Sequence, residues 1–395
     1  MTAPKQPLEG IRVLDLSSLY AGPLIATNLG DFGADVIKVE HPRGDDARRW
    51  GLTKKLPDGA DIPLWWKSIS RNKRLISLDL HLESDREIVR QLCKWADVLI
   101  ENFRPGRLEA WGLGPADLER LNPRLVVARV TGFGQTGPMK DQPGFGTLAE
   151  AFSGFAFITG EADRPPTLPP FGLADGVAAL TGTYAVMMAL YWRDAQGGRL
   201  GQTIDLSLYE PLFSILGPQA IEYAQTGTIQ TRGGNRSKRT SPRNTYRTLD
   251  ERWVALSGGT QQIVNRMLEA IEQADLIGDE RFASARARAK NSDELDGLIA
   301  AWIARHDLET VLTRFRALEA PIAPVYDIAQ IVSDAQYRAR GSVVDIPDDD
   351  LGAATMAGIV PKLSRTPGAI RHAGRTAIAH DQSEVVEMLE RLAKK

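Results

Sequence analysis

Short apolar, β-branched runs alternate with helix-forming stretches through the first half of the chain. The runs at 11–16 (IRVLDL) and 34–39 (ADVIKV) enclose a turn and a helical stretch, and this order predicts a strand–helix–strand unit. Similar runs follow at 75–80, 98–101 and 125–130. Parallel strands need such crossover connections, so the pattern predicts an α/β fold built on a parallel sheet.

The second half of the chain is mostly helical, with two interruptions of different composition. We predict mostly helices over 177–224, with 203–208 (TIDLSL) as a strand or the entry to a helix. A polar, basic, mobile loop over 225–245, a strand at 253–257, helices over 260–320, an extended linker at 320–326 and a terminal amphipathic helix at 383–394 follow. The two interruptions are typical of crossings between domains, so we expect a second domain between them.

Composition narrows the classes of protein to which the chain can belong. Its 395 residues are 43% hydrophobic and 25% charged, with a net charge of −2, which is ordinary for a globular protein and argues against a general nucleic-acid binder. No apolar run reaches about 18 residues, so no membrane span is expected. The N-terminal residues lack a signal-peptide core, so we expect a cytoplasmic location.

Cysteine and histidine usage argues against two kinds of site. The single cysteine, Cys93, excludes an intrachain disulfide and fits a reducing compartment. It lies where a helix is predicted to run into a strand, so we interpret it as a small core residue. The five histidines are scattered without metal-ligand spacing, so no metal site is expected.

Basic residues recur in the loops beside the predicted strands. The clusters lie at 43–49, 71–74 and 102–107. Ligands of open parallel sheets bind beyond the carboxyl ends of the strands, where arginine and lysine suit a multiply phosphorylated ligand. A set of solvated surface charges is the alternative. The first strand-to-helix turn lacks G-x-G-x-x-G, so a dinucleotide cofactor is not indicated.

One acidic residue, Asp175, stands in the otherwise uncharged segment PPFGLADGVAALTG at 169–182. Gly172 and Gly176 flank it, and a helix is predicted from Val177. A carboxylate at the mouth of a helix is partly desolvated and close to backbone N–H groups, which is one way to present a nucleophile. An aspartate helix cap without catalytic function is the alternative.

Six ordered blocks resemble the family III CoA-transferases, the CaiB/BaiF group that includes formyl-CoA transferase. They are PLEGIRVLDLSSLYAGP, GADVIKVEHPRGD, NKRLISLDL, ADVLIENFRPG, LNPRLVVARVTGFGQTGP and GRLGQTIDLSLYE. The resemblance implies a large Rossmann-like CoA-binding domain made from both chain ends, a smaller central α+β domain and an interlocked homodimer. The corresponding boundaries are 1–224 and 326–395 for the large domain and 225–325 for the small domain with its linkers.

The resemblance also implies a reaction. Asp175 matches the family's nucleophile, which attacks an acyl-CoA thioester and passes CoA through an aspartyl anhydride and an aspartyl-CoA thioester to a carboxylic acid acceptor. Coenzyme A thioesters then act as co-substrates, and no permanently bound cofactor is expected. The basic loop at 232–247 carries Arg232, Arg236, Arg239, Arg243 and Arg247. These residues suit a dicarboxylate such as succinate, with succinyl-CoA as donor, or they contact CoA phosphates or solvent.

Binding residues follow where the family's motifs match. The matching CoA contacts are Arg43, Asn72, Lys73, Arg74, Asn102 and Phe103. An arginine common in relatives is replaced by Ala110, so Arg104 or Arg107 is expected to supply that charge. Tyr20 stands where formyl-CoA transferase has a glutamine near the acyl group, which argues against formate or oxalate. Gly233 and Gly234 fall near the family's glycine-rich flap, or form a plain surface turn.

Two other functions compete with CoA transfer. A 2-methylacyl-CoA racemase needs two proton-transfer groups, and relatives of that type place a histidine in the segment matching 143–146, where this chain offers Phe145. A catalytically idle CoA-binding protein is the other alternative. Trapping an acyl-Asp175 adduct with hydroxylamine distinguishes a transferase from an idle binder.

Overall fold

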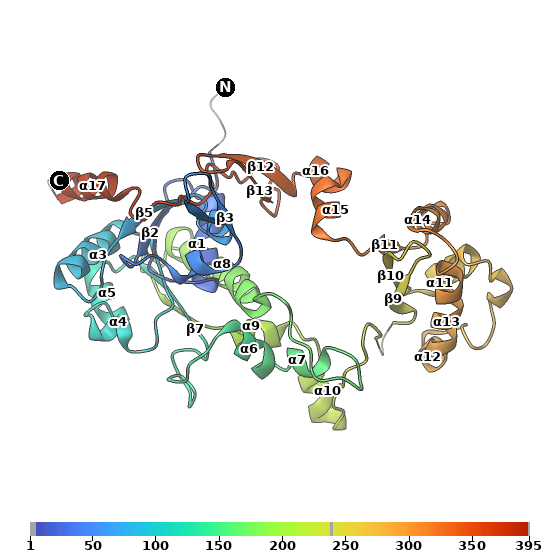
Figure 1. The fold of residues 1–395 in the computed structure, drawn as a ribbon. Helices are drawn as coiled ribbons and strands as arrows, with labels where there is room; N and C mark the ends of the chain where they lie inside the picture. The colour runs from blue at the N-terminus through green and yellow to red at the C-terminus, as the bar shows by residue number, and fades with distance from the viewer. Residues whose placement is uncertain (1–4, 238–239, 394–395) are drawn as a thin grey trace. The chain divides into compact units, whose positions relative to one another are not determined.

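The computed structural model describes residues 5–237 and 240–393. The chain divides into two compact units, each of which is described by itself (Figure 1). The large unit contains the chain through Phe155, then Leu168–Gln219, and again everything from Ala335 onward. The small unit contains Ala156–Thr167 and Ala220–Asp334.

A six-stranded parallel sheet forms the centre of the large unit, in the order β5-β2-β1-β6-β7-β8. The strands are β1 (Arg12–Asp15), β2 (Asp35–Glu40), β5 (Lys73–Ser77), β6 (Val98–Glu101), β7 (Val126–Thr131) and β8 (Thr203–Ser207). Val13 of β1 pairs with Val36 on one side and with Val98 on the other. The predicted α/β fold with a parallel sheet is therefore confirmed.

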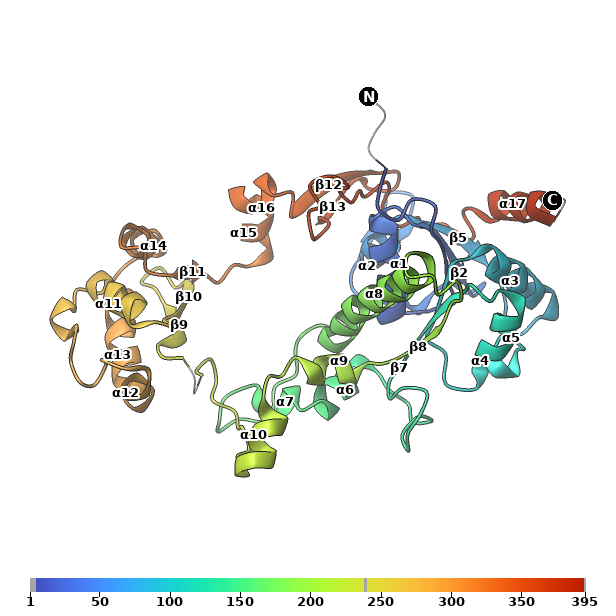
Figure 2. The same ribbon diagram turned by 180° about the vertical axis from the view of Figure 1, so that it is seen from behind.

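Helices cover both faces of this sheet, as the nearly continuous apolar character of its strands requires. On one face, alternate strand residues pack with α1 (Ala21–Asp31) and α8 (Leu173–Asp194). On the other face, they pack with α3 (Glu83–Trp95), α5 (Pro115–Leu121) and α17 (Gln382–Ala393), as Figure 2 shows from behind. Cys93 of α3 is fully buried in the core on this second face, and burial raises the pKa of its thiol to about 12.

Helix α8 is the longest helix of the large unit and packs closely against α1. A Cβ at Gly182 would lie 2.4 Å from Ile25, and Asn28 donates a hydrogen bond to Thr183. Among the described residues, α8 is the one helix long and apolar enough to cross a membrane by length and composition alone. Its buried face belongs to the core of the sheet, and its other face is exposed and apolar.

Shorter elements complete the large unit. They are η1 (Asp46–Arg49), β3 (Thr53–Lys55), β4 (Asp61–Pro63), α2 (Leu64–Ile69), α4 (Arg107–Ala110), α6 (Gly146–Phe152), α9 (Tyr209–Ser214), α16 (Ala335–Ala339), β12 (Val343–Asp348) and β13 (Gly352–Ala357). Strands β12 and β13 form an antiparallel hairpin, as do β3 and β4. Helix α7 (Phe155–Ile158) begins where the chain first enters the small unit, and α10 (Gln219–Thr226) where it enters again.

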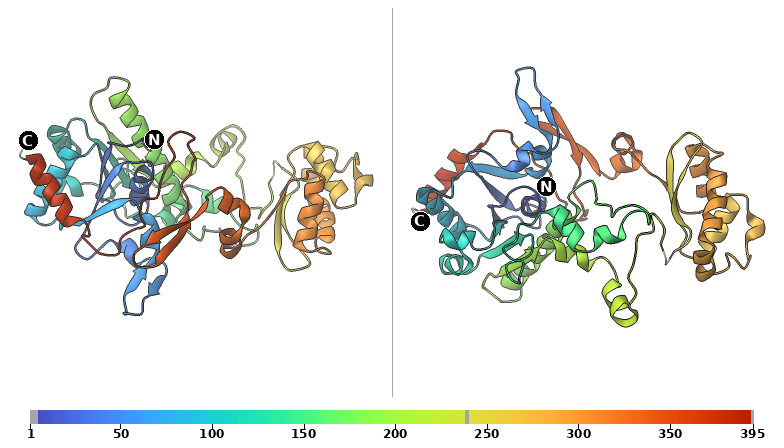
Figure 3. Two further views of the ribbon diagram at one scale, coloured as in Figure 1. Left: turned by 90° about the horizontal axis from the view of Figure 1, so that it is seen from above. Right: turned by 60° about the horizontal axis from the view of Figure 1, so that its bottom comes forward.

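The small unit combines an antiparallel three-stranded sheet with helices, which gives it the predicted α+β character. Its elements are β9 (Arg243–Arg247), β10 (Trp253–Ser257), α11 (Gln261–Ala270), η2 (Ala274–Leu276), α12 (Ala285–Lys290), α13 (Ser292–Ile303), α14 (Leu308–Ala317), β11 (Ile322–Pro324) and α15 (Ile328–Ser333). Helices gather against one face of this sheet (Figure 3). Thr260 and Asp307 accept hydrogen bonds from backbone N–H groups in the first turns of α11 and α14.

The segment 320–326 differs from its expected role as an extended linker. Residues Ile322–Pro324 form β11, which pairs with β10 at the edge of the small sheet. An edge strand tolerates proline because one side of its backbone makes no ladder hydrogen bonds. Pro321 therefore directly precedes an edge strand, and Pro324 is its last residue.

Candidate active site

A cavity of about 440 Å³ lies at the carboxyl edge of the parallel sheet. It is lined by the last residues of β2 and by residues that follow β1, β2, β5 and β6: Leu16, Ser17, Ser18, Lys38, Val39, Glu40, His41, Arg43, Gly44, Asp45, Asp46, Arg49, Leu78, Leu80, His81, Phe103 and Trp111. The strand order reverses direction between β1 and β6, so the cavity straddles the point where ligands of open α/β sheets bind. Its volume suits a small-molecule ligand.

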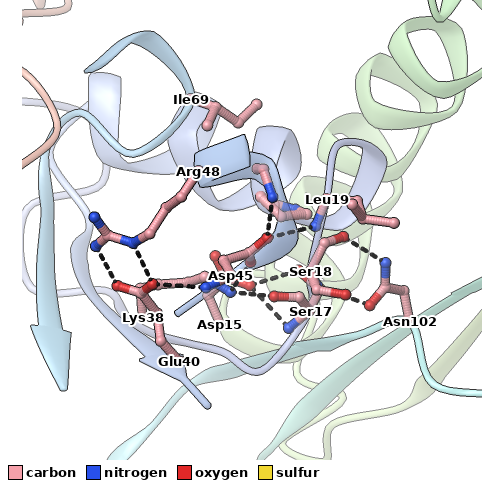
Figure 4. A network of polar contacts seen from close by, with 12 residues as sticks. Asp15, Ser17, Ser18, Leu19, Lys38, Glu40, Asp45, Arg48, Ile69 and Asn102 are labelled. Atoms are coloured by element: carbon pink, nitrogen blue, oxygen red, sulfur yellow. Dashed lines mark hydrogen bonds and ion pairs between the residues drawn. The ribbon is translucent and has the colours of Figure 1, made fainter. Parts of the chain in front are cut away.

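Buried ion pairs line part of the cavity, and Figure 4 shows their contacts. Lys38 and Asp45 are paired at 3.1 Å, and Lys73, which does not line the cavity, pairs with Asp15 at 3.0 Å. Burial works to lower the pKa of Lys38, but the carboxylates of Asp15, Asp45 and Glu40 outweigh it and raise that pKa. The Lys38 ammonium group therefore stays charged and fixes the loops that it contacts.

The rim of the cavity near β6 is organised by side chains that contact backbone groups. Asn102 accepts a hydrogen bond from Ser18 N–H at 2.8 Å and donates one to the Ser18 carbonyl at 2.7 Å. The Phe103 ring meets Trp111 edge-on at 5.2 Å, and the Arg107 guanidinium lies 5.6 Å from the Trp111 ring centre. Two aromatic faces with a cation beside them can receive a nucleotide base.

Asp175 lies in the first turn of α8, where the helix offers few backbone carbonyls to its N–H groups. The N-cap of α8 is Gly172 and not Asp175, so the interpretation of Asp175 as an aspartate cap is wrong. Burial, followed by the nearby Glu150 carboxylate, raises the pKa of Asp175 from 3.8 to about 6. Glu150 is itself buried and accepts a hydrogen bond from Ala174 N–H at 3.2 Å.

Glycines give the Asp175 carboxylate its space. A Cβ added at Gly146, the first residue of α6, would lie 1.9 Å from Asp175 Oδ2. A Cβ at Gly172 would lie 3.2 Å from the same oxygen. The carboxylate therefore rests directly against the backbone of two segments, and any larger residue at Gly146 would displace it.

An aromatic row adjoins the carboxylate. The Tyr20 ring is 3.0 Å from the Cβ position of Gly172 and meets Trp65 edge-on at 5.1 Å, and Trp65 in turn meets Trp50 at 6.4 Å. Burial, followed by the Asp175 charge, raises the pKa of Tyr20, so its hydroxyl stays protonated at neutral pH. The indole Nε1 of Trp65 is buried without a hydrogen-bond partner among the described residues.

One loop joins the cavity to the carboxylate. Leu16, Ser17 and Ser18 line the cavity, and Tyr20, two residues further on, packs beside Asp175. The loop between β1 and α1 therefore contributes residues both to the cavity wall and to the surroundings of Asp175.

The predicted CoA contacts divide into two groups. Arg43 and Phe103 line the cavity. Asn102 and Arg107 do not line it, but Asn102 is hydrogen-bonded to the lining residue Ser18, and Arg107 lies against the ring of the lining residue Trp111. Arg104 is exposed beside this rim.

Asn72, Lys73 and Arg74 do not line the cavity. Asn72 bonds Asp31 at 2.8 Å and Lys73 bonds Asp15, both in the interior. Arg74 pairs with Asp35 at 2.6 Å, at the amino end of β2 and therefore at the opposite edge of the sheet. Their predicted CoA contacts stay a prediction, while the structure gives them internal partners.

Gly233 and Gly234 lie in the small unit, where Gly234 N–H donates to the Gly160 carbonyl at 2.9 Å. Their role as a flap over the acyl group stays a prediction. The nearby basic residues have internal partners: Arg236 pairs with Asp293 and Asp296, Arg243 donates to the Asn235 carbonyl, Arg247 pairs with Glu251, and Arg232 donates to the Phe157 carbonyl. Arg239 lies outside the described residues.

The sequence patterns did not single out Glu150, Lys38, Trp65 or Trp111. Glu150 reaches Asp175 from α6, and no local pattern around residue 150 marks this contact. Lys38 and Asp45 could have been suspected, because a lysine inside the apolar run ADVIKVE needs a buried partner. Within 5–237 and 240–393, no cluster of three or more His, Cys, Asp or Glu residues could hold a metal ion.

Comparison with known proteins finds relatives over nearly the whole chain. The family model of CoA-transferase family III matches residues 8–375. Succinyl-CoA–D-citramalate CoA-transferase of Chloroflexus aurantiacus is 38% identical over 387 residues, which cover 98% of this chain and 95% of the relative. The beta subunit of succinyl-CoA–L-malate CoA-transferase from the same organism is 38% identical over 392 residues, with coverage of 98% and 95%.

A solved structure shows the same fold. The crystal structure of a CAIB/BAIF family protein from Brucella suis matches with a TM-score of 0.86 at 30% identity, and the match covers 98% of this chain and 100% of that one. The resemblance stated from the six sequence blocks is confirmed by the family match and by this structure. The chain belongs to CoA-transferase family III.

Proposed function

We propose that this protein transfers CoA from succinyl-CoA to a hydroxylated dicarboxylic acid, with Asp175 as the covalent relay. The observation that carries the proposal is the half-buried Asp175 carboxylate in the first turn of α8, whose pKa is raised to about 6 and which lies beside Tyr20, two residues after the cavity-lining Ser18. Relatives named for succinyl-CoA with D-citramalate or L-malate support this substrate class.

The proposed reaction balances without ATP or a cofactor. The Asp175 carboxylate attacks the thioester carbonyl, the C–S bond breaks, and CoA thiolate leaves an aspartyl–succinyl anhydride. The thiolate then attacks the aspartyl carbonyl, which releases succinate and leaves an aspartyl-CoA thioester. The acceptor carboxylate attacks that thioester and forms a second anhydride. The thiolate finally attacks the acceptor's carbonyl, which frees Asp175.

The surroundings of Asp175 suit this chemistry. With a pKa of about 6, the carboxylate is ionised at neutral pH and is more basic than an ordinary aspartate, which strengthens it as a nucleophile. The partly buried position limits the access of water that would hydrolyse an anhydride. The protonated Tyr20 hydroxyl provides a donor beside the reacting carboxylate, and Lys38 and Arg43 offer positive charge in the cavity.

A substrate screen tests the proposal. With succinyl-CoA as donor, we expect D-citramalate and L-malate to be converted to their CoA thioesters faster than acetate or oxalate, measured by chromatography of the CoA esters. Asp175→Ala serves as the inactive control. Absence of transfer to every dicarboxylate tested, together with exchange of the C2 proton of 2-methylacyl-CoA in deuterated water, would instead support the racemase alternative.

We further propose that two copies of the chain associate through α8, consistent with the interlocked homodimer that the resemblance implies. Leu180, Tyr184, Met187, Met188 and Tyr191 form a stripe at helical spacing, and all are exposed, Leu180 by 64% and Met188 by 65%. An apolar stripe of this size on a single chain marks an interaction surface.

Charge on this stripe is expected to break the dimer. Light scattering coupled to gel filtration should give about twice the chain mass of 43.3 kDa for the native protein and a smaller mass or aggregation for Leu180→Glu/Met188→Glu. Leu249→Glu, on an equally exposed leucine (64%) of the small unit, is the matched control. A monomeric native protein would contradict the proposal.

A further inference from the structure

Leu19, which directly precedes Tyr20, has an unusual backbone conformation. Its φ is +69°, in the left-handed region that a branched side chain rarely adopts. Such a conformation persists only where surrounding contacts determine it, and it often occurs at functional sites. Here it turns the chain between the cavity-lining Ser18 and the start of α1.

Asp45 supplies the contact that fixes this conformation. Its Oδ1 accepts hydrogen bonds from Leu19 N–H at 3.1 Å and from Ala47 N–H at 2.9 Å, while Oδ2 pairs with Lys38 (Figure 4). Asp45 and Lys38 are both buried. Burial works to raise the pKa of Asp45, but Lys38 and the two N–H groups outweigh it and lower that pKa, so the carboxylate is charged.

Neighbouring contacts secure the residues before Leu19. Lys38 also donates to the Ser17 carbonyl, and Asn102 holds both backbone groups of Ser18. Three consecutive residues of the loop are therefore hydrogen-bonded to the buried Lys38 and Asp45 or to the partly buried Asn102, and Tyr20 follows them. Lys38 lies in β2 and Asp45 in the segment that follows it, so the pair couples that wall of the cavity to the loop beside Asp175.

We propose that Asp45 is a positioning residue which, paired with Lys38, keeps Leu19 left-handed and thereby sets the Tyr20 ring against Asp175. The inference rests on the proposed function, because its consequence is the geometry of the acyl-transfer step. Asp45 also caps η1. If that cap were its only role, the activity lost by substituting Asp45 would not be restored by a second substitution at Leu19.

The test exploits the freedom of glycine at positive φ. Asp45→Ala is expected to slow formation of the hydroxylamine-trapped Asp175 adduct by about tenfold or more, with the KM for acyl-CoA changed less than kcat. Asp45→Asn keeps an acceptor oxygen, so its rate of adduct formation should lie between those of the native protein and Asp45→Ala. Leu19→Gly in the Asp45→Ala background is expected to restore the rate to within about threefold of the native protein, since glycine needs no carboxylate to stay left-handed.

Two further variants keep the test decisive if Asp45→Ala does not fold. Leu19→Val places a β-branched residue in the left-handed region and should lower kcat, although Asp45 is intact. Glu272→Gly, at an exposed left-handed position of the small unit (φ +60°), is the control and should leave kcat unchanged. Full activity of both Asp45→Ala and Leu19→Val would overturn the proposal, as would an Asp45→Ala defect that Leu19→Gly leaves unrepaired.

A spectroscopic readout separates this inference from the proposed function. Tyr20 and Trp65 are in edge contact at 5.1 Å, so their coupling contributes to the near-UV circular dichroism of the native protein. Asp45→Ala should change that spectrum, and Leu19→Gly should restore it, even if the native protein transferred no CoA. Inactivity of the native protein would contradict the proposed function alone, and an unchanged spectrum in Asp45→Ala would contradict the positioning role.

Discussion

Asp175→Asn is expected to abolish CoA transfer and to make the protein more stable. The amide cannot form the aspartyl anhydride, so kcat should fall by about 10⁴-fold or more, the range seen when a covalent nucleophile is removed. Hydroxylamine should then trap no adduct at this position. Transfer at the native rate in Asp175→Asn would show that another group carries the acyl chain.

The gain in stability has a defined pH dependence. Because the pKa of Asp175 is raised from 3.8 to about 6, the folded protein holds a proton that the unfolded chain releases, and stability is lost as the pH rises through about 6. The difference of about two pH units corresponds to about 3 kcal/mol, and partial exposure reduces it to about 1–2 kcal/mol. In urea unfolding, Asp175→Asn should have a higher free energy of unfolding than the native protein at pH 8 but not at pH 4.

Glu150→Gln is the matched control for that experiment. Its amide oxygen can still accept the Ala174 N–H hydrogen bond, while the charge that helps to raise the pKa of Asp175 is gone. Transfer activity should survive, and the acidic limb of the pH–rate profile should move to lower pH. An unmoved profile would mean that burial alone sets the basicity of Asp175.

Gly146→Ala should have the second-largest effect on activity. The new Cβ would lie 1.9 Å from Asp175 Oδ2 and 3.0 Å from its Cγ, so the carboxylate must move away from its place. A displacement of this kind is expected to cost about 10²-fold in kcat, because acyl transfer depends on the position of the attacking oxygen. Steady-state kinetics with the substrates of the screen would measure it.

The helical position makes the control for Gly146→Ala informative. Alanine favours helices over glycine, so the substitution alone should stabilise α6 if space allowed it. Gly297 in α13 has no atoms within 4 Å of its Cβ position, and Gly297→Ala should therefore keep activity and gain stability. If Gly146→Ala behaved like Gly297→Ala, the carboxylate would have to occupy a different position from the one described.

The local patterns predicted five of the six strands of the parallel sheet, because each of these five has its own apolar run, whereas β8 (Thr203–Ser207) lies in a stretch that the patterns left open between a strand and a helix. Residues 98–101 form β6 as predicted, whereas the run at 75–80 forms β5 two residues earlier, at Lys73–Ser77. The strand begins with Lys73, which is buried against Asp15, 58 residues away, and a strand can contain such a lysine only when its partner is present. No pattern near residue 73 announces that partner.

The same limit applies to the site. Asp175 could be singled out because it is the one charge in its segment, but its carboxylate depends on Glu150 and Gly146 from α6 and on Tyr20 from the first loop. Asn72 looked like a ligand contact, yet its side chain bonds Asp31 and the Ala369 carbonyl, 297 residues away. A polar side chain can face a ligand or bond to another part of the chain. Contacts between residues hundreds of positions apart decide between the two, and local patterns do not contain them.

The return of the chain from Ala335 onward into the large unit has a consequence for biosynthesis. Val385 and Leu389 of α17 belong to the core of the sheet that begins with β1. A ribosome therefore completes the entire small unit before it releases the helix that closes the large one. We expect the small unit to fold before α17 is available and the large unit to finish only once α17 has left the ribosome, with its apolar sheet face exposed to chaperones until then.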